Sequence, residues 1–133
     1  MNTKRLLLAF VAAVLVANVY EFLVYGMLLK SFHAQFPNLL KPEGQIPMLR
    51  MFLTGAFGVA VASVFYALFA RGRASGLMTG IVFGVLMGLS NAWVPQAYNK
   101  MLLINWPFYL HWATAGFCES LVVGIVLGLV YKD

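Results

Sequence analysis

Hydrophobic and polar positions along the chain fall into long blocks. Four apolar stretches are separated by three polar connections and flanked by short charged ends. Each stretch is long enough to cross a hydrocarbon core of about 30 Å as an α-helix. We therefore predict an all-α membrane protein, a single transmembrane domain over 1–133, with spans at about 6–29, 51–70, 76–94 and 108–131.

Small residues recur at four-residue intervals and so line one face of three predicted helices. In a water-soluble helix each glycine would cost about 1 kcal/mol relative to alanine, but in lipid this spacing lets two helix backbones approach closely. We therefore predict an antiparallel four-helix transmembrane bundle packed through glycine and alanine seams, with packing favoured over a pore lining. The small residues are Ala9, Ala13 and Ala17 in the first span, Gly76, Gly80, Gly84 and Gly88 in the third, and Gly116, Ser120, Gly124 and Gly128 in the fourth.

The composition supports a membrane protein and excludes several functions. The chain is 62% hydrophobic and 10% charged, far outside the range of soluble globular proteins. The net charge is +5. In a membrane protein such an excess of positive charge usually lies in the loops and sets the orientation, so it gives no support to nucleic-acid binding. The sequence contains no nucleophile–base–acid set, phosphate loop, dinucleotide fingerprint or clustered metal spacing. We therefore expect no enzyme activity, cofactor or metal.

Basic residues indicate the orientation. Lys4 and Arg5 precede the first span, and Arg71 and Arg73 form a tight turn between the second and third spans. Positive charge near the ends of spans favours the cytoplasm, so both termini are predicted there. The N-terminal segment also resembles a secretory signal peptide, but its apolar run continues to Leu29, which favours an uncleaved span.

Two connections carry aromatic residues and prolines. The connection over 31–50 is predicted to be an ordered interfacial loop, with Phe32, Phe36, Leu39 and Leu40 as candidates for a short interfacial turn. The third span is predicted to end at Pro95, because proline breaks a regular helix. The aromatic residues in and near the connection over 95–107 predict a belt at one membrane face: Trp93, Tyr98, Trp106, Tyr109 and Trp112.

Two glutamates lie inside the predicted spans. An ionisable group at mid-helix costs about 3 kcal/mol on insertion scales, so each needs a partner or a function. At 1.5 Å per residue, Glu21 lies about 12 Å from the Leu29 end of its span and Glu119 about 16 Å from the Phe108 end of its own. These two ends share one side of the membrane, so the glutamates have similar depth. We predict a polar intramembrane cluster of Glu21, Glu119, Asn18, Tyr25, Asn91 and His111.

The cluster has three interpretations. A protonated glutamate can serve only as an interhelical hydrogen-bond donor, the cluster can be a proton, ion or substrate site, or it can contact another subunit. For His111, an interfacial belt residue is favoured over a metal or tetrapyrrole ligand.

The chain resembles small bacterial four-span membrane families catalogued as domains of unknown function. The resemblance rests on four spans, the Tyr25-Gly26 pair closing the first, the glycine-rich third span from Gly76, a proline- and aromatic-rich connection, and Gly124 to Gly128 near the end. It implies a bacterial cytoplasmic (inner) membrane location and brings no activity, cofactor or functional residue.

Two functions follow from these features. The first is a small binding or accessory protein in the lipid bilayer, which associates with its own copies or with other membrane subunits. The alternative is a small proton-coupled transporter or channel that uses Glu21 and Glu119.

Overall fold

The computed structural model describes residues 2–38, 45, 47–74, 76–99 and 106–131, with the side chains of 93–99 excepted. These residues form helices and turns, and no strand occurs among them. Along the chain the helices are α1 (Thr3–Leu23), the π-helix η1 (Val24–Leu28), α2 (Lys30–His33), α3 (Met48–Phe69), α4 (Leu77–Asn99) and α5 (Trp106–Val130).

Long apolar helices dominate the fold. Within the described ranges, three helical stretches are long and apolar enough to cross a membrane, namely Thr3–Leu28, Met48–Phe69 and Trp106–Val130. The apolar part of α4 that is described, Leu77–Ala92, is shorter. Large apolar side chains on the outer faces of these helices are exposed. Length, composition and apolar surface together indicate an integral membrane protein.

The helices begin and end close to the predicted positions, with three differences. The helix α3 begins at Met48, so Arg50 lies inside a helix rather than in the connection. The helix α4 does not end at Pro95 but continues to Asn99, which membrane helices allow because other groups can satisfy the backbone that proline frees. The connection after the first span begins with the short helix α2. Leu39, Leu40 and the side chains of Trp93 and Tyr98 lie outside the described residues.

The first helix changes its winding at Val24. The backbone N–H of Leu29 donates to the carbonyl of Val24 at 2.8 Å, which closes a π-helical turn. The apolar run predicts one continuous span to Leu29, because hydrophobicity alone does not distinguish four-residue from five-residue spacing.

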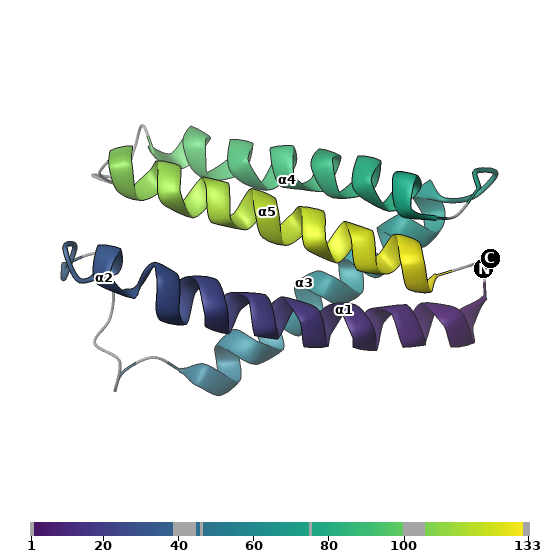
Figure 1. The fold of residues 1–133 in the computed structure, drawn as a ribbon, viewed down its shortest axis with the longest axis horizontal. Helices are drawn as coiled ribbons and strands as arrows, with labels where there is room; N and C mark the ends of the chain where they lie inside the picture. Colours follow the sequence, from purple (N-terminus) through teal and green to yellow (C-terminus); the bar gives the residue numbers. More distant parts are fainter. Residues whose placement is uncertain (1, 39–44, 46, 75, 100–105, 132–133) are drawn as a thin grey trace.

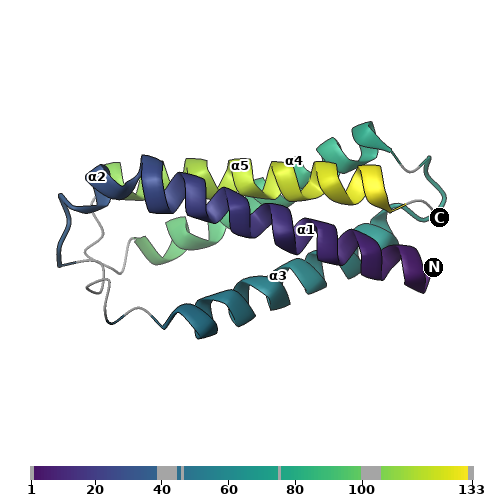
Figure 2. The same ribbon diagram turned by 60° about the horizontal axis from the view of Figure 1, so that its bottom comes forward.

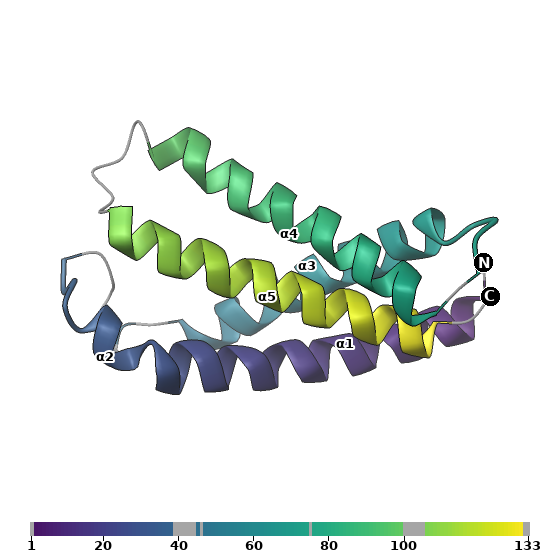
Figure 3. The ribbon, with the colours of Figure 1, turned by 45° about the horizontal axis from the view of Figure 1, so that its top comes forward.

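The helices lie lengthwise beside one another. Figure 1 shows the start of α1 and the end of α5 at one end of the molecule, and the end of α4 and start of α5 at the other. Figure 3 shows α5 between α4 and α1. The helix α3 packs chiefly on α1, and Figure 2 shows it diverging from the other helices away from the termini. We call the end with the start of α1 the terminal end and the other the distal end.

The apolar core sits toward the terminal end. Tyr66 on α3 is fully buried, and its ring packs edge-on against Phe83 of α4 and Tyr131 beyond α5, at centroid distances of 5.2 and 6.0 Å. The alanines of the predicted first-span seam are buried in the same core: Ala9, Ala13 and Ala17. The buried apolar core therefore joins α1, α3, α4 and α5 at the terminal end.

The backbones of α4 and α5 meet at four glycines. A Cβ added to Gly80 would lie 2.5 Å from the carbonyl oxygen of Gly124, and one added to Gly128 would lie 2.8 Å from the Cα of Gly80. Gly84 faces the backbone of Leu121 at 2.8 Å in the same way. The two helices are thus as close as glycine permits, because any side chain at these positions would overlap the facing backbone.

The other small residues predicted for these seams have different surroundings. A Cβ on Gly88 would meet the ring of Phe117 at 2.6 Å, whereas one on Gly76 would meet nothing within 4 Å. A Cβ on Gly116 would make an ordinary contact, 3.9 Å from the hydroxyl of Tyr25. The closest approach of α4 and α5 is therefore confined to the middle and terminal half of the pair.

Candidate functional site

The two intramembrane glutamates face one small cavity between α1, α3 and α5. Its volume is about 20 Å³, which is room for a single water molecule. Both carboxyl groups are half-buried. The residues around the cavity are Val14, Ala17, Asn18 and Glu21 of α1, Phe52, Gly55, Ala56 and Val59 of α3, and Glu119 of α5.

Gly55 makes room for the carboxylate of Glu21. A Cβ at this position would lie 3.7 Å from Oε1 of Glu21, so the carboxylate reaches the surface of α3. Glu21 lies in the same four-residue register as the buried Ala13 and Ala17, which directs it toward the other helices. Sequence reasoning missed Gly55. The signal for it is the four-residue register of α3 that starts at Gly55 and continues through Val59 to the buried Ser63.

Two tyrosines of the first helical stretch lie on the side of the Glu119 carboxylate. The hydroxyl of Tyr20 donates to the carbonyl of Ala115 on α5 at 2.7 Å, and this bond joins α1 to α5 one turn from Glu119. Tyr20 and Tyr25 both interact electrostatically with Glu119, and Glu119 interacts with Glu21. Tyr20 was not predicted, although it directly precedes Glu21.

Asn18 borders the cavity, and one of its side-chain N–H groups is already hydrogen-bonded elsewhere. Its side-chain Nδ2 donates to the carbonyl of Val14 at 2.8 Å, within its own helix. The second N–H of Nδ2 and the amide oxygen therefore remain for the cavity, since the side chain borders that space.

Two residues of the predicted cluster lie elsewhere. Asn91 of α4 is exposed, and its Nδ2 donates to Oγ of Ser120 at 2.9 Å. Ser120 in turn donates to the carbonyl of Gly116 at 3.0 Å. These two successive hydrogen bonds connect α4 to α5 outside the glutamate cavity. The depth argument placed Asn91 at the right level but could not give the direction in which it points.

His111 belongs to an aromatic cluster at the distal end. Its Nδ1 bonds the carbonyl of Pro107 at 2.8 Å, and because a carbonyl only accepts, Nδ1 carries the proton. The imidazole stacks on Phe32 with ring centroids 4.0 Å apart. Phe32 also packs against Phe36 and Phe108, at 5.2 and 6.3 Å. These rings dock α2 on the start of α5.

His33 lies at the edge of the same aromatic cluster. Its ring stacks on Tyr25 at 6.4 Å and approaches Phe108 at 5.7 Å. Burial lowers the pKa of His33 from its ordinary value of 6.5, so the neutral imidazole is favoured. In the described part of the chain no group of three or more His, Cys, Asp or Glu could hold a metal ion.

The structure thus brings Glu21, Glu119 and Asn18 to one cavity. Tyr25 is not among the described residues that line it, and its hydroxyl instead lies 3.9 Å from where a Cβ of Gly116 would be. Asn91 and His111 lie apart from the cavity. Two carboxyl groups beside a water-sized space can share a proton, exchange one, or hydrogen-bond across the helix interface.

Comparison of the chain with protein-family models, curated proteins and solved structures found no match.

Proposed function

We propose that this chain is an antiparallel four-helix bundle of the bacterial cytoplasmic membrane, with glycine seams and both termini in the cytoplasm, that works by association. Its partner is a second copy or another membrane subunit, for which the bundle supplies a helix-packing surface. The observation that carries this proposal is the exposed amide of Asn91 on α4.

The amide is costly in contact with lipid. Asn91 lies about 12 Å along the helix from Asn99, so it is below the membrane surface if α4 spans the bilayer. The described residues give its side chain one partner, Ser120, whereas an amide can form four hydrogen bonds. Polar side chains in membrane helices face other helices and hydrogen-bond across them. A partner helix beside α4 would satisfy the rest of this amide.

Association can be tested with matched polar variants. We expect native mass spectrometry of protein gently extracted from its membrane to show an oligomer or a defined hetero-complex, and Asn91→Leu to weaken it. Ser120→Ala removes the bond within the chain but keeps the amide, so it should preserve association. Thr114→Val is the control, because the exposed Thr114 hydroxyl already donates to Leu110 within its own helix at 2.7 Å. A strictly monomeric parent protein without partners would refute the proposal.

A second candidate function is proton-coupled transport through the glutamates. It is favoured by one observation, that Glu21 and Glu119 line the same cavity. In proteoliposomes with an internal pH dye, the parent protein should move protons in exchange for substrate. Glu21→Gln and Glu119→Gln should each abolish that flux, whereas Thr114→Val should preserve it. The absence of flux in the parent, or unchanged flux in both glutamine variants, would remove this candidate.

A further inference from the structure

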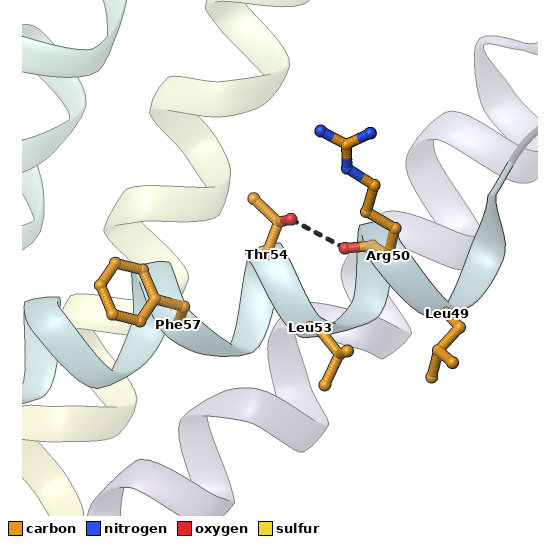
Figure 4. Close-up of a pocket in the computed structure, with 5 residues that line it drawn as sticks. All are labelled: Leu49, Arg50, Leu53, Thr54 and Phe57. Carbon is orange, nitrogen blue, oxygen red and sulfur yellow. Dashed lines mark hydrogen bonds between the residues drawn. The ribbon is translucent and has the colours of Figure 1, made fainter.

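A hollow lies on the outer face of α3 in its distal half. Its volume is about 390 Å³. The described residues around it come from three successive turns of one helix, and Figure 4 shows two leucines on one flank and a basic and a hydroxyl side chain on the other, with a phenylalanine one turn further on. They are Leu49, Arg50, Leu53, Thr54 and Phe57.

One side of the hollow is apolar and uncovered. Leu49, Leu53 and Phe57 are 73%, 57% and 70% exposed. They recur every four residues, so they form a strip about 12 Å long parallel to the helix axis. In a spanning helix such a strip runs in the direction of the neighbouring acyl chains. The strip therefore fits a hydrocarbon tail.

The other side carries a positive charge at the end of the strip. Arg50 is exposed and lies in the first turn of α3, where the apolar span begins. No carboxylate among the described residues forms an ion pair with it. The Thr54 hydroxyl donates to the backbone carbonyl of Arg50 at 2.8 Å, and Figure 4 shows the exposed guanidinium on the same side of the helix as that hydroxyl. Guanidinium groups at the ends of spans lie at the level of lipid headgroups and bind phosphate oxygens in pairs.

We propose that this hollow binds one phospholipid with an anionic headgroup. Its acyl chain lies along Leu49, Leu53 and Phe57, and its phosphate oxygens accept hydrogen bonds from Arg50. An anionic headgroup fits better than a zwitterionic one, because a zwitterionic headgroup brings its own cation to the phosphate. The proposal requires that α3 spans the membrane, and it does not depend on the association proposed above.

Charge argues against a second copy as the occupant. The carboxylates of the described residues are Glu21 and Glu119, and both line the inner cavity. The described part of another copy therefore offers no carboxylate to Arg50. Lipid phosphate supplies the missing counter-charge at the correct depth.

Native mass spectrometry of the full chain in mild detergent tests this assignment. The probes are dioleoyl phosphatidylglycerol and dioleoyl phosphatidylcholine, which share acyl chains and differ in headgroup charge. We expect the parent protein to retain the glycerol lipid preferentially. Arg50→Gln should reduce that preference roughly fivefold, as expected for one basic side chain near a membrane surface. Leu53→Ala combined with Phe57→Ala should lower retention of both lipids and keep their ratio.

Arg71→Gln is the matched control, because Arg71 is also exposed but lies at the terminal end of the molecule. It should keep the parent preference. Circular dichroism should show equal helix content in all variants, since every substituted side chain is exposed. Equal retention of the two lipids by the parent, an unchanged preference in Arg50→Gln, an equal loss in Arg71→Gln, or displacement of the lipid by millimolar inorganic phosphate would each overturn the proposal.

Discussion

The contact between α4 and α5 gives the sharpest quantitative prediction. In Gly124→Ala the added methyl group would lie 2.6 Å from both the carbonyl oxygen of Gly80 and the Cα of Gly84. These are backbone atoms, so they cannot rotate away as a side chain can. To restore ordinary van der Waals contact at 3.4 Å, the helices must separate by roughly 0.8 Å. We expect the free energy of unfolding to fall by about 2 kcal/mol, as for other overpacked contacts.

Gly58 on α3 provides the matched control. A Cβ added there would meet nothing within 4 Å, and the position is exposed. Gly58→Ala therefore tests the same chemical change without the overlap, and it should leave the free energy of unfolding unchanged or raise it by up to about 1 kcal/mol, because alanine favours helix. Reversible unfolding of both variants in mixed detergent micelles, followed by circular dichroism, measures the difference.

The reasoning would be refuted by equal stability of the two variants. Equal stability would mean that α4 and α5 can separate at no cost, so glycine would not determine how closely they pack. A loss in Gly58→Ala as large as in Gly124→Ala would also contradict it. That result would show that helix glycines matter for a reason other than the facing backbone.

Three further predictions concern other contacts. Tyr20→Phe removes the hydrogen bond to α5 and should lower the free energy of unfolding by about 1 kcal/mol in the same micelle assay; no change would mean that the bond is replaced. Because burial lowers the pKa of His33 below 6.5, the unfolded chain binds more protons just below that pH, so stability falls there as the solution is acidified. After correction for the intrinsic slowing of amide exchange in acid, the protection of α2 amides should therefore fall from pH 7 to pH 5, and His33→Gln should lose this decrease. Arg73 lies 4.3 Å from the ring centroid of Phe69, and Arg73→Gln should cost about 0.5 to 1 kcal/mol, whereas an unchanged stability would exclude this cation–π contact as a stabilising one.

Sequence reasoning located the glutamates well because depth is a one-dimensional property. The rise of a helix fixes how far Glu21 and Glu119 lie from the ends of their spans, and the structure places both at one cavity. Direction around the helix axis is a different quantity. It separated Asn91 from the cavity, since rotation depends on how the helices pack and not on residue spacing alone. His111 is separated along the axis instead, because it lies eight positions, about 12 Å, from Glu119 on the same helix.

The seams show the same limit in another form. The four-residue spacing marks Gly76 and Gly80 equally, yet a Cβ added to Gly80 would overlap the backbone of α5, whereas one added to Gly76 would meet nothing within 4 Å. Two helices that cross at an angle approach closely over part of their length, so a regular pattern makes contact at some of its positions. The sequence also predicts a helix end at Pro95, where the structure continues to Asn99, because the rule for proline is derived from helices in water.

The π-helical turn at Val24–Leu28 has a consequence for how α2 could change during evolution. A π turn contains one residue more than an α turn, so Leu29 is five residues after Val24 and yet closes a single turn with it. Removing one residue from a regular helix would rotate everything after it by about 100°. Removing one residue from this turn would instead restore α-helical winding, with Leu29 still one turn after Val24. A single-residue deletion in this segment would therefore preserve both the glutamate cavity and the aromatic docking of Phe32 and His33 on the start of α5.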